Sequence, residues 1–309
     1  MVENKEKIDF SHITTAERER YESLLFNQGV RGCEFSFANL YLWGRQNIAF
    51  VGDFALMFSQ FDRRSVYPYP LGTGDIRAAV DAIIEDAESR GIPCRITGIL
   101  EQEKELLESL YPSRFRFHSA KGSYDYVYDV NDLADLQGKK YHPKRNHLNR
   151  FVEAYPDYRA VPIDEENKTL AREFVMRWFD ERLSENPDAD YHMERAAIER
   201  AFRDYTALGL EGLMLIAGGE VLGITMASRL SCDTFDVHFE KARADIQGAY
   251  VAINYSLARY IREKYPEVKY LDREEDMGLE GLRRAKRSYH PHHMVKKYWA
   301  CLLEVGYDY

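Results

Sequence analysis

The segment 213–264, LMLIAGGEVLGITMASRLSCDTFDVHFEKARADIQGAYVAINYSLARYIREK, predicts the centre of one folded unit. Gly218 and Gly219 separate two apolar runs, as in a two-stranded hairpin, and a third run alternates in polarity. The expected strands are 213–217, 221–230 and 234–240. A helix is expected over 249–264, because apolar side chains recur there at helical spacing: Val251, Tyr255, Ala258 and Ile261.

The same unit extends to both sides of this segment. Before it, apolar periodicity predicts a strand and two helices: 159–163, 168–183 and 193–208. After it, shorter patterns predict a strand, a helix and a final strand: 268–271, 279–287 and 294–305. An α/β unit with a mixed sheet is therefore expected in the second half. Its order of elements is similar to that of the GNAT acyltransferase fold.

The first half repeats part of this order. A helix at 15–26 opens with a possible capping box at Thr14 and Glu17, and Gly91 is expected to end a later helix that starts near Ile76. The other expected elements are a hairpin at 48–51 and 54–59, strands at 95–99, 115–117 and 124–130, and a helix at 101–110. The repetition predicts two tandem GNAT-like α/β domains, 1–133 and 134–309.

Composition narrows the class of protein. The 309 residues are 45% hydrophobic and 13% aromatic, enough for two cores, and the net charge of −9 argues against a surface that coats nucleic acid. A local basic site remains open. The chain contains neither a long uncharged apolar run nor an N-terminal signal pattern, so a cytoplasmic protein without an integral membrane segment is expected. The four cysteines form no CxxC motif.

Two stretches carry a more specific pattern. The first joins YDYVY (124–128) through DL (132–133) and LQGKK (136–140) to KRNHLNRF (144–151). The second is LDREEDMGLEGLRRAKRSYHP (271–291), followed by KKY (296–298). Together they resemble the soluble catalytic domain of phosphatidylglycerol lysyltransferases and its uncharacterised relatives.

That resemblance implies tandem acyltransferase folds and transfer of an aminoacyl group from charged tRNA to a lipid headgroup. It also implies a distant relation to the peptidoglycan aminoacyl ligases. The lipid-modifying members carry a large N-terminal membrane region, and this sequence has no such segment. The acceptor is therefore left open between a lipid headgroup and a small molecule.

The segment 139–150 is basic and contains no acidic side chain. On a helix, Lys140, Lys144 and His147 would share one face, with Arg145 and Asn149 on the next. Such faces can bind phosphates through point charges and forked guanidinium contacts. A solvated linker helix explains the same charges. Both interpretations stay open.

The segment 281–297 is also basic, and Arg283, Lys286 and Lys297 are expected to hold phosphate or a developing oxyanion. An acidic group precedes it: Asp272, Glu274, Glu275 and Asp276. Glu275 and Asp276 are expected to hold a substrate ammonium group, because ligands of open α/β sheets lie at strand ends. The alternative is helix capping, with acids at the start and bases at the end of a helix.

The turn before the long second-half helix bears on the choice of donor. Coenzyme A enzymes of this fold use the turn to bind pyrophosphate, but here Asp245 and Tyr250 stand where a polar donor and a small residue are usual. Coenzyme A is therefore disfavoured, although Gly248 at the helix start can still admit an anion. Asn254, one turn further on, is a candidate for the same cleft, and a hydrogen-bonded structural Asn is the alternative.

The histidines give weaker signals. His290 and its neighbours have no spacing typical of metal ligands, so no metal site is predicted. Tyr289 or His290 is a candidate proton shuttle. His238 shares one side of a strand with Asp236, and a structural role is the ordinary interpretation. The spacings of serine hydrolases, zinc peptidases and P-loop kinases are absent from the sequence.

The sequence thus predicts an enzyme that transfers an aminoacyl group from aminoacyl-tRNA to an amine or hydroxyl acceptor, without metal or cofactor. The predicted catalytic residues are Glu275, Asp276, Arg283, Lys286 and Tyr289. The predicted substrate-binding residues are Lys140, Lys144, Arg145, Asn149, Gly248, Asn254 and Lys297. An acyl-coenzyme A N-acyltransferase and a non-catalytic ligand-binding module are the alternatives.

Overall fold

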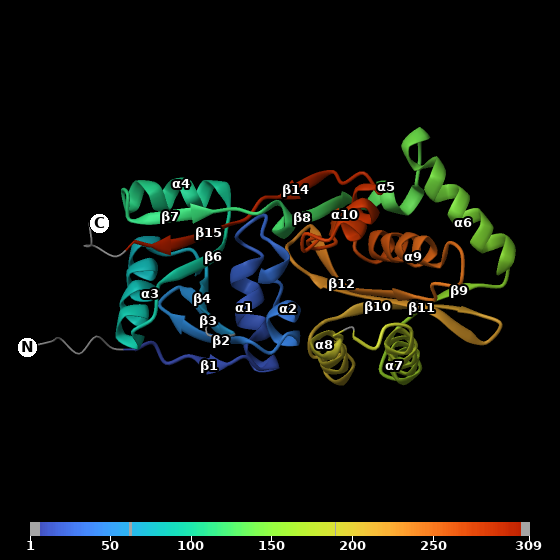
Figure 1. The fold of residues 1–309 in the computed structure, drawn as a ribbon, viewed down its shortest axis with the longest axis horizontal. Coiled ribbons are helices and arrows are strands. Elements are labelled where there is room, and N and C mark those ends of the chain that lie inside the picture. The colour runs from blue at the N-terminus through green and yellow to red at the C-terminus, as the bar shows by residue number, and fades with distance from the viewer. Residues whose placement is uncertain (1–6, 62–63, 189, 304–309) are drawn as a thin grey trace, which may run out of the picture. The chain divides into compact units, whose positions relative to one another are not determined.

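The computed structural model describes residues 7–61, 64–188 and 190–303. The chain forms two compact units, Met1–Tyr124 with Val295–Tyr309, and Asp125–Met294. Each unit has its own sheet with helices packed around it (Figure 1). The predicted mixed α/β class is confirmed. Among the described residues, every helix is too short or too polar to cross a bilayer.

The sheet of the first unit contains eight strands among the described residues, and β4 and β6 pair in parallel. The path along it is β1 (Ser11–His12), β2 (Gln46–Val51), β3 (Phe54–Phe61), β4 (Arg64–Pro68), β6 (Arg95–Ile99), β15 (Tyr298–Leu302) and β7 (Phe115–His118), with β5 (Leu71–Gly72) beside β3. Its helices are α1 (Arg18–Leu25), α2 (Phe37–Leu42), α3 (Ile76–Arg90) and α4 (Glu101–Leu110).

Helix α3 shows how local sequence sets an element in this unit. The Asp75 side chain accepts hydrogen bonds from the first backbone N–H groups of the helix, and Gly91 ends it at φ 67°. Val80 and Ile83 lie on its buried face. The predicted helix and its glycine stop are confirmed, and so is the capping box of Thr14 and Glu17.

The sheet of the second unit contains seven strands among the described residues. Their order is β14 (His293–Val295), β8 (Asp125–Asp129), β13 (Tyr270–Asp272), β12 (Thr234–Ala242), β11 (Glu220–Arg229), β10 (Glu211–Ala217) and β9 (Arg159–Pro162). The three strands and the helix predicted from 213–264 are all present. Strand β12 pairs in parallel with β13 and antiparallel with β11.

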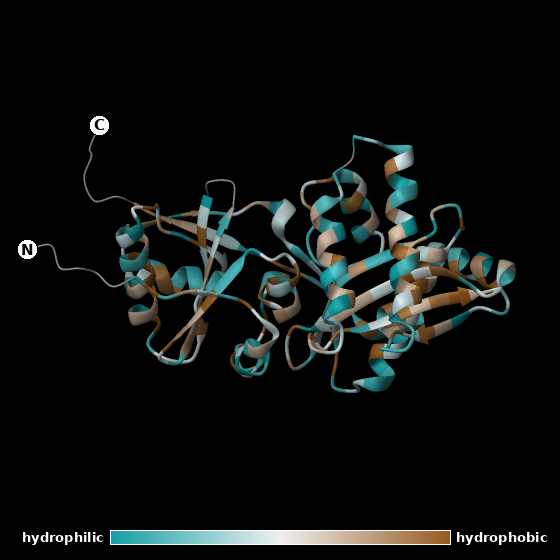
Figure 2. Cartoon of the chain, turned by 90° about the horizontal axis from the view of Figure 1, so that it is seen from below, coloured by the Kyte–Doolittle hydropathy of each residue, from teal (hydrophilic) through white to brown (hydrophobic). Residues whose placement is uncertain are grey.

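Helices cover both faces of this sheet. On one face lie α5 (Val130–Asp135), α6 (His142–Ala154), α9 (Ala249–Lys264) and α10 (Glu280–Arg287), and on the other α7 (Lys168–Glu185) and α8 (His192–Arg203) (Figure 1). Buried side chains of α9, including Leu257 and Ile261, pack in one cluster with Phe235 of β12. In Figure 2 the helices of this unit alternate brown with teal, as expected for helices with one face on the core.

Two features of β12 shape the region around it. It pairs with β13 only from Thr234 to Asp236, so its later residues diverge from that neighbour. It also contains a β-bulge at His238, because Met226 pairs with Phe239 and Ala227 with Val237. Backbone pairing therefore stops after Asp236 and Asp272, and the side chains beyond these two residues meet through their own contacts.

The two sheets divide the chain differently from the expected boundary at residue 133. The strand predicted at 124–130 is β8, and it pairs with β13 of the second unit. Within the described residues, the strand predicted at 294–305 is two strands, β14 beside β8, and β15 between β6 and β7 of the first unit, and positions 304 and 305 lie outside the described residues. Each of β8 and β15 completes hydrogen bonds on both of its edges in the sheet that it joins. A local strand pattern does not specify that choice.

Candidate functional site

A group of polar side chains from separate segments meets in the second unit. We call it the central polar cluster: Lys144 of α6, Glu240 of β12, Asn254 of α9, Arg273 after β13 and Tyr289 after α10. Lys144, Asn254 and Tyr289 were predicted from the sequence as site residues. Glu240 and Arg273 were not.

Arg273 and Glu240 connect the diverging ends of β13 and β12. The Arg273 Nη2 donates a hydrogen bond to Glu240 Oε1 at 2.8 Å, and the side chains are 14% and 12% exposed. Burial opposes the charged form of Arg273, but the Glu240 carboxylate and two neighbouring tyrosines outweigh it, so the pKa of Arg273 lies above its ordinary value. This ion pair forms the charged centre of the cluster.

Asn254 is fully buried against this ion pair. Its Nδ2 lies 3.3 Å from Glu240 Oε2 and donates to it. Within the described residues, Asn254 Oδ1 and Arg273 Nη1 are buried without a hydrogen-bond partner. An unsatisfied buried polar atom costs about 1–3 kcal/mol. One free acceptor and one free donor beside a carboxylate are suited to bind a polar ligand.

Lys144 and Tyr289 lie on another side of Arg273. The Lys144 Nζ is 3.7 Å from the centre of the Tyr289 ring, and the Arg273 guanidinium is 4.8 Å from the same ring. Burial, with the nearby Arg273 charge, lowers the pKa of Lys144 to about 8. Burial raises the pKa of Tyr289, so its hydroxyl stays protonated. Lys144 is thus the cluster's titrating group near neutral pH.

Asp276 and Arg283 form a separate, saturated network. The two oxygens of buried Asp276 accept hydrogen bonds from Arg283 Nε (2.8 Å) and Nη2 (3.1 Å), Tyr126 Oη (2.7 Å) and the Gly278 N–H (2.8 Å). These contacts, led by Arg283, lower the pKa of Asp276 to about 2. The geometry is that of a structural tie between α10 and β8. A direct role for these two residues in substrate binding finds no support in it.

Lys286 also supports the backbone of the site. Its Nζ donates to the carbonyl oxygens of Arg273 and Glu274. Lys286 therefore holds the segment that carries Arg273, which is a positioning role. Glu275, predicted to bind a substrate ammonium, is half-buried beside this segment.

Several basic side chains in and just before helix α6 contact other parts of the protein. Lys144 and Arg145 are both half-buried, so these two side chains are not fully solvated as in a simple linker helix. Arg145 donates to the carbonyls of Leu136 and Gly138 and so closes the loop before α6. Lys140 forms an exposed ion pair with Asp132 at 2.8 Å. Asn149 is exposed.

Two other predicted binding residues have structural surroundings. Gly248 begins α9 at φ 87°, and a Cβ there would lie 2.2 Å from the His147 carbonyl oxygen of α6. The helix start is therefore covered by backbone, and exposed Asp245 beside it is paired with Arg243 at 2.6 Å. Lys297 belongs to the first unit, where its Nζ lies 2.9 Å from Glu34 Oε2. Its predicted place in the second-half site does not match this position.

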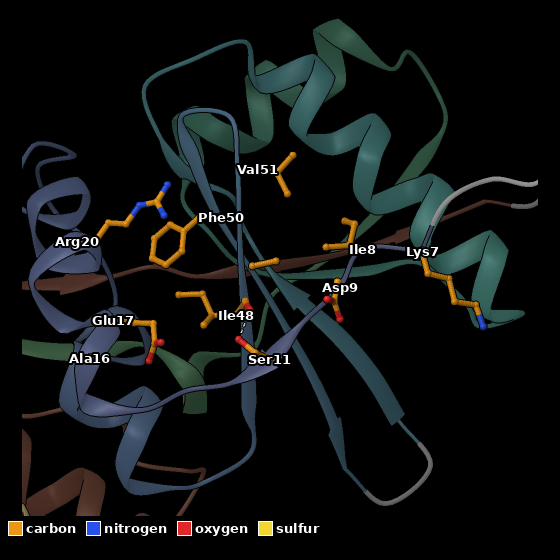
Figure 3. Close-up of a pocket in the computed structure, with 11 residues that line it drawn as sticks. Lys7, Ile8, Asp9, Ser11, Ala16, Glu17, Arg20, Ile48, Phe50 and Val51 are labelled. Carbon is orange, nitrogen blue, oxygen red and sulfur yellow. Dashed lines mark hydrogen bonds between the residues drawn. The ribbon is translucent and has the colours of Figure 1, made fainter.

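The first unit contains an open pocket of about 690 Å³ (Figure 3). Its lining includes Asp9, Glu17, Arg20 and Phe50, and the Arg20 guanidinium lies 3.9 Å from the Phe50 ring centre. None of the residues predicted as catalytic or substrate-binding lines it.

The sequence points only weakly to Glu240 and Arg273, the two residues of the central polar cluster that were not predicted. Glu240 lies near the end of a strand of alternating polarity that also contains Asp236 and Lys241, so its charge does not stand out. Arg273 is the cation within the acidic stretch 272–276. Neither observation identifies the other member of the ion pair, because the pair joins segments that are distant along the chain.

Several known proteins are similar to the chain. An uncharacterized protein of Mycoplasmoides gallisepticum, MYCGA3080, is 27% identical over 207 residues, which are 66% of this chain and 62% of that protein. A conserved protein of unknown function from Bacteroides thetaiotaomicron is 36% identical with a TM-score of 0.91, covering 96% of this chain and 100% of that one. L-PGS from Bacillus licheniformis is 15% identical with a TM-score of 0.66, covering 92% and 91%.

The fold likeness extends to a tandem GNAT protein from the clavulanic acid biosynthesis pathway. It is 9% identical with a TM-score of 0.50, covering 96% of this chain and 99% of that one. The predicted GNAT-like fold is thereby confirmed. A profile described as "Phosphatidylglycerol lysyltransferase, C-terminal" matches residues 28–301. The resemblance found in the sequence is confirmed, and the chain belongs to this family.

Proposed function

We propose that this chain transfers an aminoacyl group from aminoacyl-tRNA to an amine or hydroxyl acceptor, and that the central polar cluster is its active site. The observation that carries the proposal is the pair of unfilled buried atoms, Arg273 Nη1 and Asn254 Oδ1, on either side of Glu240. Membership in a family of aminoacyl transfer supplies the reaction class.

The cluster matches the charges of an aminoacyl ester. The substrate's α-ammonium group is a donor, and Glu240 and Asn254 Oδ1 are acceptors that can hold it. The ester carbonyl gains negative charge during attack, and the free N–H of Arg273 Nη1 is a donor for that oxyanion. Such preorganised donors typically contribute about 10²–10³ in rate. The ester is already activated, so positioning and charge stabilisation suffice.

Lys144 supplies the proton transfer in this scheme. Its pKa of about 8 leaves part of the side chain as a neutral amine near neutral pH. The acceptor's oxygen or nitrogen attacks the ester carbon and passes its proton to Lys144 Nζ. The tetrahedral intermediate then collapses, the ribose oxygen leaves, and Lys144 returns the proton to it. One bond to the carbonyl carbon forms and one breaks, without a change of oxidation state.

The tRNA body would be bound by exposed cations near the cluster. Lys139, just before α6, and Arg150, within α6, are both exposed and could bind phosphates. A pyrophosphate at the start of α9 would meet Asp245 and the α6 backbone at Gly248. Both features disfavour coenzyme A as the donor. We place the reaction in the cytoplasm, where charged tRNA occurs.

The acceptor is proposed as a hydroxyl or amine on a lipid headgroup or a small molecule. Lysyl-tRNA and total aminoacyl-tRNA, labelled in the amino acid, would be incubated with the protein and either phosphatidylglycerol vesicles or a soluble metabolite extract. Transfer of label to the lipid or to the soluble fraction separates the two acceptor sources. Loss of ester without a labelled product would indicate hydrolysis only.

The variant Arg273→Lys tests the site itself. It keeps the charge but removes the forked geometry, so transfer should fall about 100-fold or more. Arg243→Lys is the matched control, because Arg243 forms an exposed ion pair with Asp245. Equal activity of the two variants would contradict the assignment. Tight binding of acetyl-coenzyme A in calorimetry would favour acyl-coenzyme A transfer instead, and binding of neither donor would favour a non-catalytic module.

A further inference from the structure

We propose that Asp236, His238 and Glu274 form a binding site for one divalent transition-metal cation of the Zn²⁺ type. We call these three residues the His238 site. They lie in the second unit, on β12 and in the turn after β13. They are distinct from the five residues of the central polar cluster, and the proposed aminoacyl transfer does not require them to touch the substrate.

The distances fit a small tetrahedral cation. The His238 Nδ1 lies 3.3 Å from Asp236 Oδ2 and 3.7 Å from Glu274 Oε1, and the three ligand atoms lie within 4.8 Å of one another. A tetrahedral Zn²⁺ with bonds of about 2.0–2.1 Å places its ligand atoms about 3.3–3.4 Å apart. The three side chains therefore need only small shifts to coordinate one ion. Imidazole nitrogen and carboxylate oxygen are both ordinary zinc ligands.

The hydrogen bonding of His238 leaves the correct nitrogen for a metal. Its Nε2 lies 2.8 Å from Ser228 Oγ, and among the described residues its Nδ1 has no hydrogen-bond partner. An Nε2–H that donates to Ser228 leaves a lone pair on Nδ1, facing two carboxylates. Metal-bound histidines commonly donate their other N–H in this way.

Burial makes a cation at this point favourable. The side chain of His238 is 1% exposed and that of Asp236 is 0% exposed. Negative charges in such surroundings are stabilised by pairing or by metal coordination. The Glu274 side chain is 25% exposed, so this carboxylate lies on the solvent side of the site. A water would be the fourth ligand of a tetrahedral ion there.

Two backbone irregularities direct these side chains to one point. His238 is the extra residue of the β-bulge in β12. Glu274 adopts φ 57°, which costs a non-glycine residue about 1–3 kcal/mol. The Glu274 N–H donates to Asp272 Oδ1 at 2.8 Å, and its carbonyl accepts from Lys286 Nζ at 3.1 Å. Irregularities of this kind concentrate at functional sites.

A bound cation would also act on the central polar cluster. Glu274 directly follows Arg273, whose guanidinium pairs with Glu240. A metal bond to the Glu274 carboxylate would hold this turn and thereby restrain Arg273. The proposed role of the ion is therefore to position Arg273.

The test uses the full chain after removal of metals with a chelator. Zn²⁺ is titrated by calorimetry, and Co²⁺ by its visible absorption, which is intense for tetrahedral sites. One ion per chain is expected, with a raised unfolding temperature. His238→Gln and Glu274→Gln should each weaken binding at least about 100-fold, and Ser228→Ala about 10–100-fold.

The double variant His292→Gln, His293→Gln is the control for adventitious binding. These two histidines lie side by side at the surface, with their Nδ1 atoms 2.9 Å apart. If this variant loses the ion and His238→Gln keeps it, the proposal is wrong. Absence of stoichiometric binding, together with nitrogen NMR shifts of a doubly protonated His238 ring at neutral pH, would show that a proton occupies the position instead. The Glu274 side chain is partly exposed, and glutamine has nearly the same shape, so Glu274→Gln should fold. This variant therefore tests the metal site if His238→Gln does not fold.

Discussion

Replacing Asp276 by Asn should remove a measurable part of the stability of the second unit. The four donors around Asp276 lower its folded-state pKa from 3.8 to about 2, with Arg283 the largest cause. One pKa unit corresponds to about 1.4 kcal/mol, so the charged form of Asp276 contributes about 2 kcal/mol to the free energy of unfolding.

The sign of the pH dependence follows from the lowered pKa. An acid whose pKa is lower in the folded state stabilises the protein above its unfolded-state pKa. That contribution is fully present at pH 7 and is lost as the pH falls from about 4 towards about 2. The difference in stability between the wild type and Asp276→Asn should therefore be about 2 kcal/mol at neutral pH and should shrink across this window.

Urea unfolding followed by Trp178 fluorescence would measure this difference in the second unit. Trp43 and Trp299 would be replaced by Phe, because they belong to the first unit. Asp245→Asn is the control, since its exposed ion pair with Arg243 should contribute under about 1 kcal/mol. A loss below about 1 kcal/mol for Asp276→Asn, or a loss that does not change with pH, would refute the reasoning.

Three further predictions concern the second unit. The transfer rate should rise as the pH increases through about 8, because Lys144 loses its proton there, and Lys144→Ala should abolish this rise in a pH–rate profile. Replacing both Lys139 and Arg150 by Glu should weaken tRNA binding and lower its salt dependence in a filter assay, by about 0.7–0.9 in the slope of log affinity against log salt for each phosphate that the protein no longer neutralises. Gly248→Ala should lower the free energy of unfolding by about 1–3 kcal/mol in urea titrations, because the Cβ of the alanine would lie 2.2 Å from the His147 carbonyl oxygen. An unchanged midpoint would show that α6 shifts without cost and would contradict this prediction.

The structure changes the roles expected of the two basic segments. Arg283 and Lys286 were predicted to bind phosphate, but their nitrogens contact Asp276 and backbone carbonyls. Of the basic residues predicted in α6, Lys144 is the one that reaches the central polar cluster. We therefore propose that Arg273 and Lys144, and not the cations of α10, interact with the reacting ester. A tRNA-binding role remains a proposal for the exposed residues of the α6 region.

The sequence by itself determined most of the individual elements. The hairpin and helix of 213–264 are predictable because strand and helix periods are properties of neighbouring residues. The ends of α3 are predictable for the same reason, since Asp75 and Gly91 act on adjacent backbone groups. The family signature also contains Lys144 and Tyr289, and the turn before the long helix pointed to Asn254, but neither shows what these residues contact.

Only the tertiary structure decided which sheet β8 and β15 join and which side chains meet. Strand pairing satisfies backbone hydrogen bonds between segments that are far apart along the chain, and no local pattern encodes the partner. The ion pair of Glu240 with Arg273 joins β12, which continues beyond its pairing with β13, to the segment that follows the end of β13. Convergence of Glu274 on His238 needs, in addition, a bulge and a left-handed residue, which are set by packing around them.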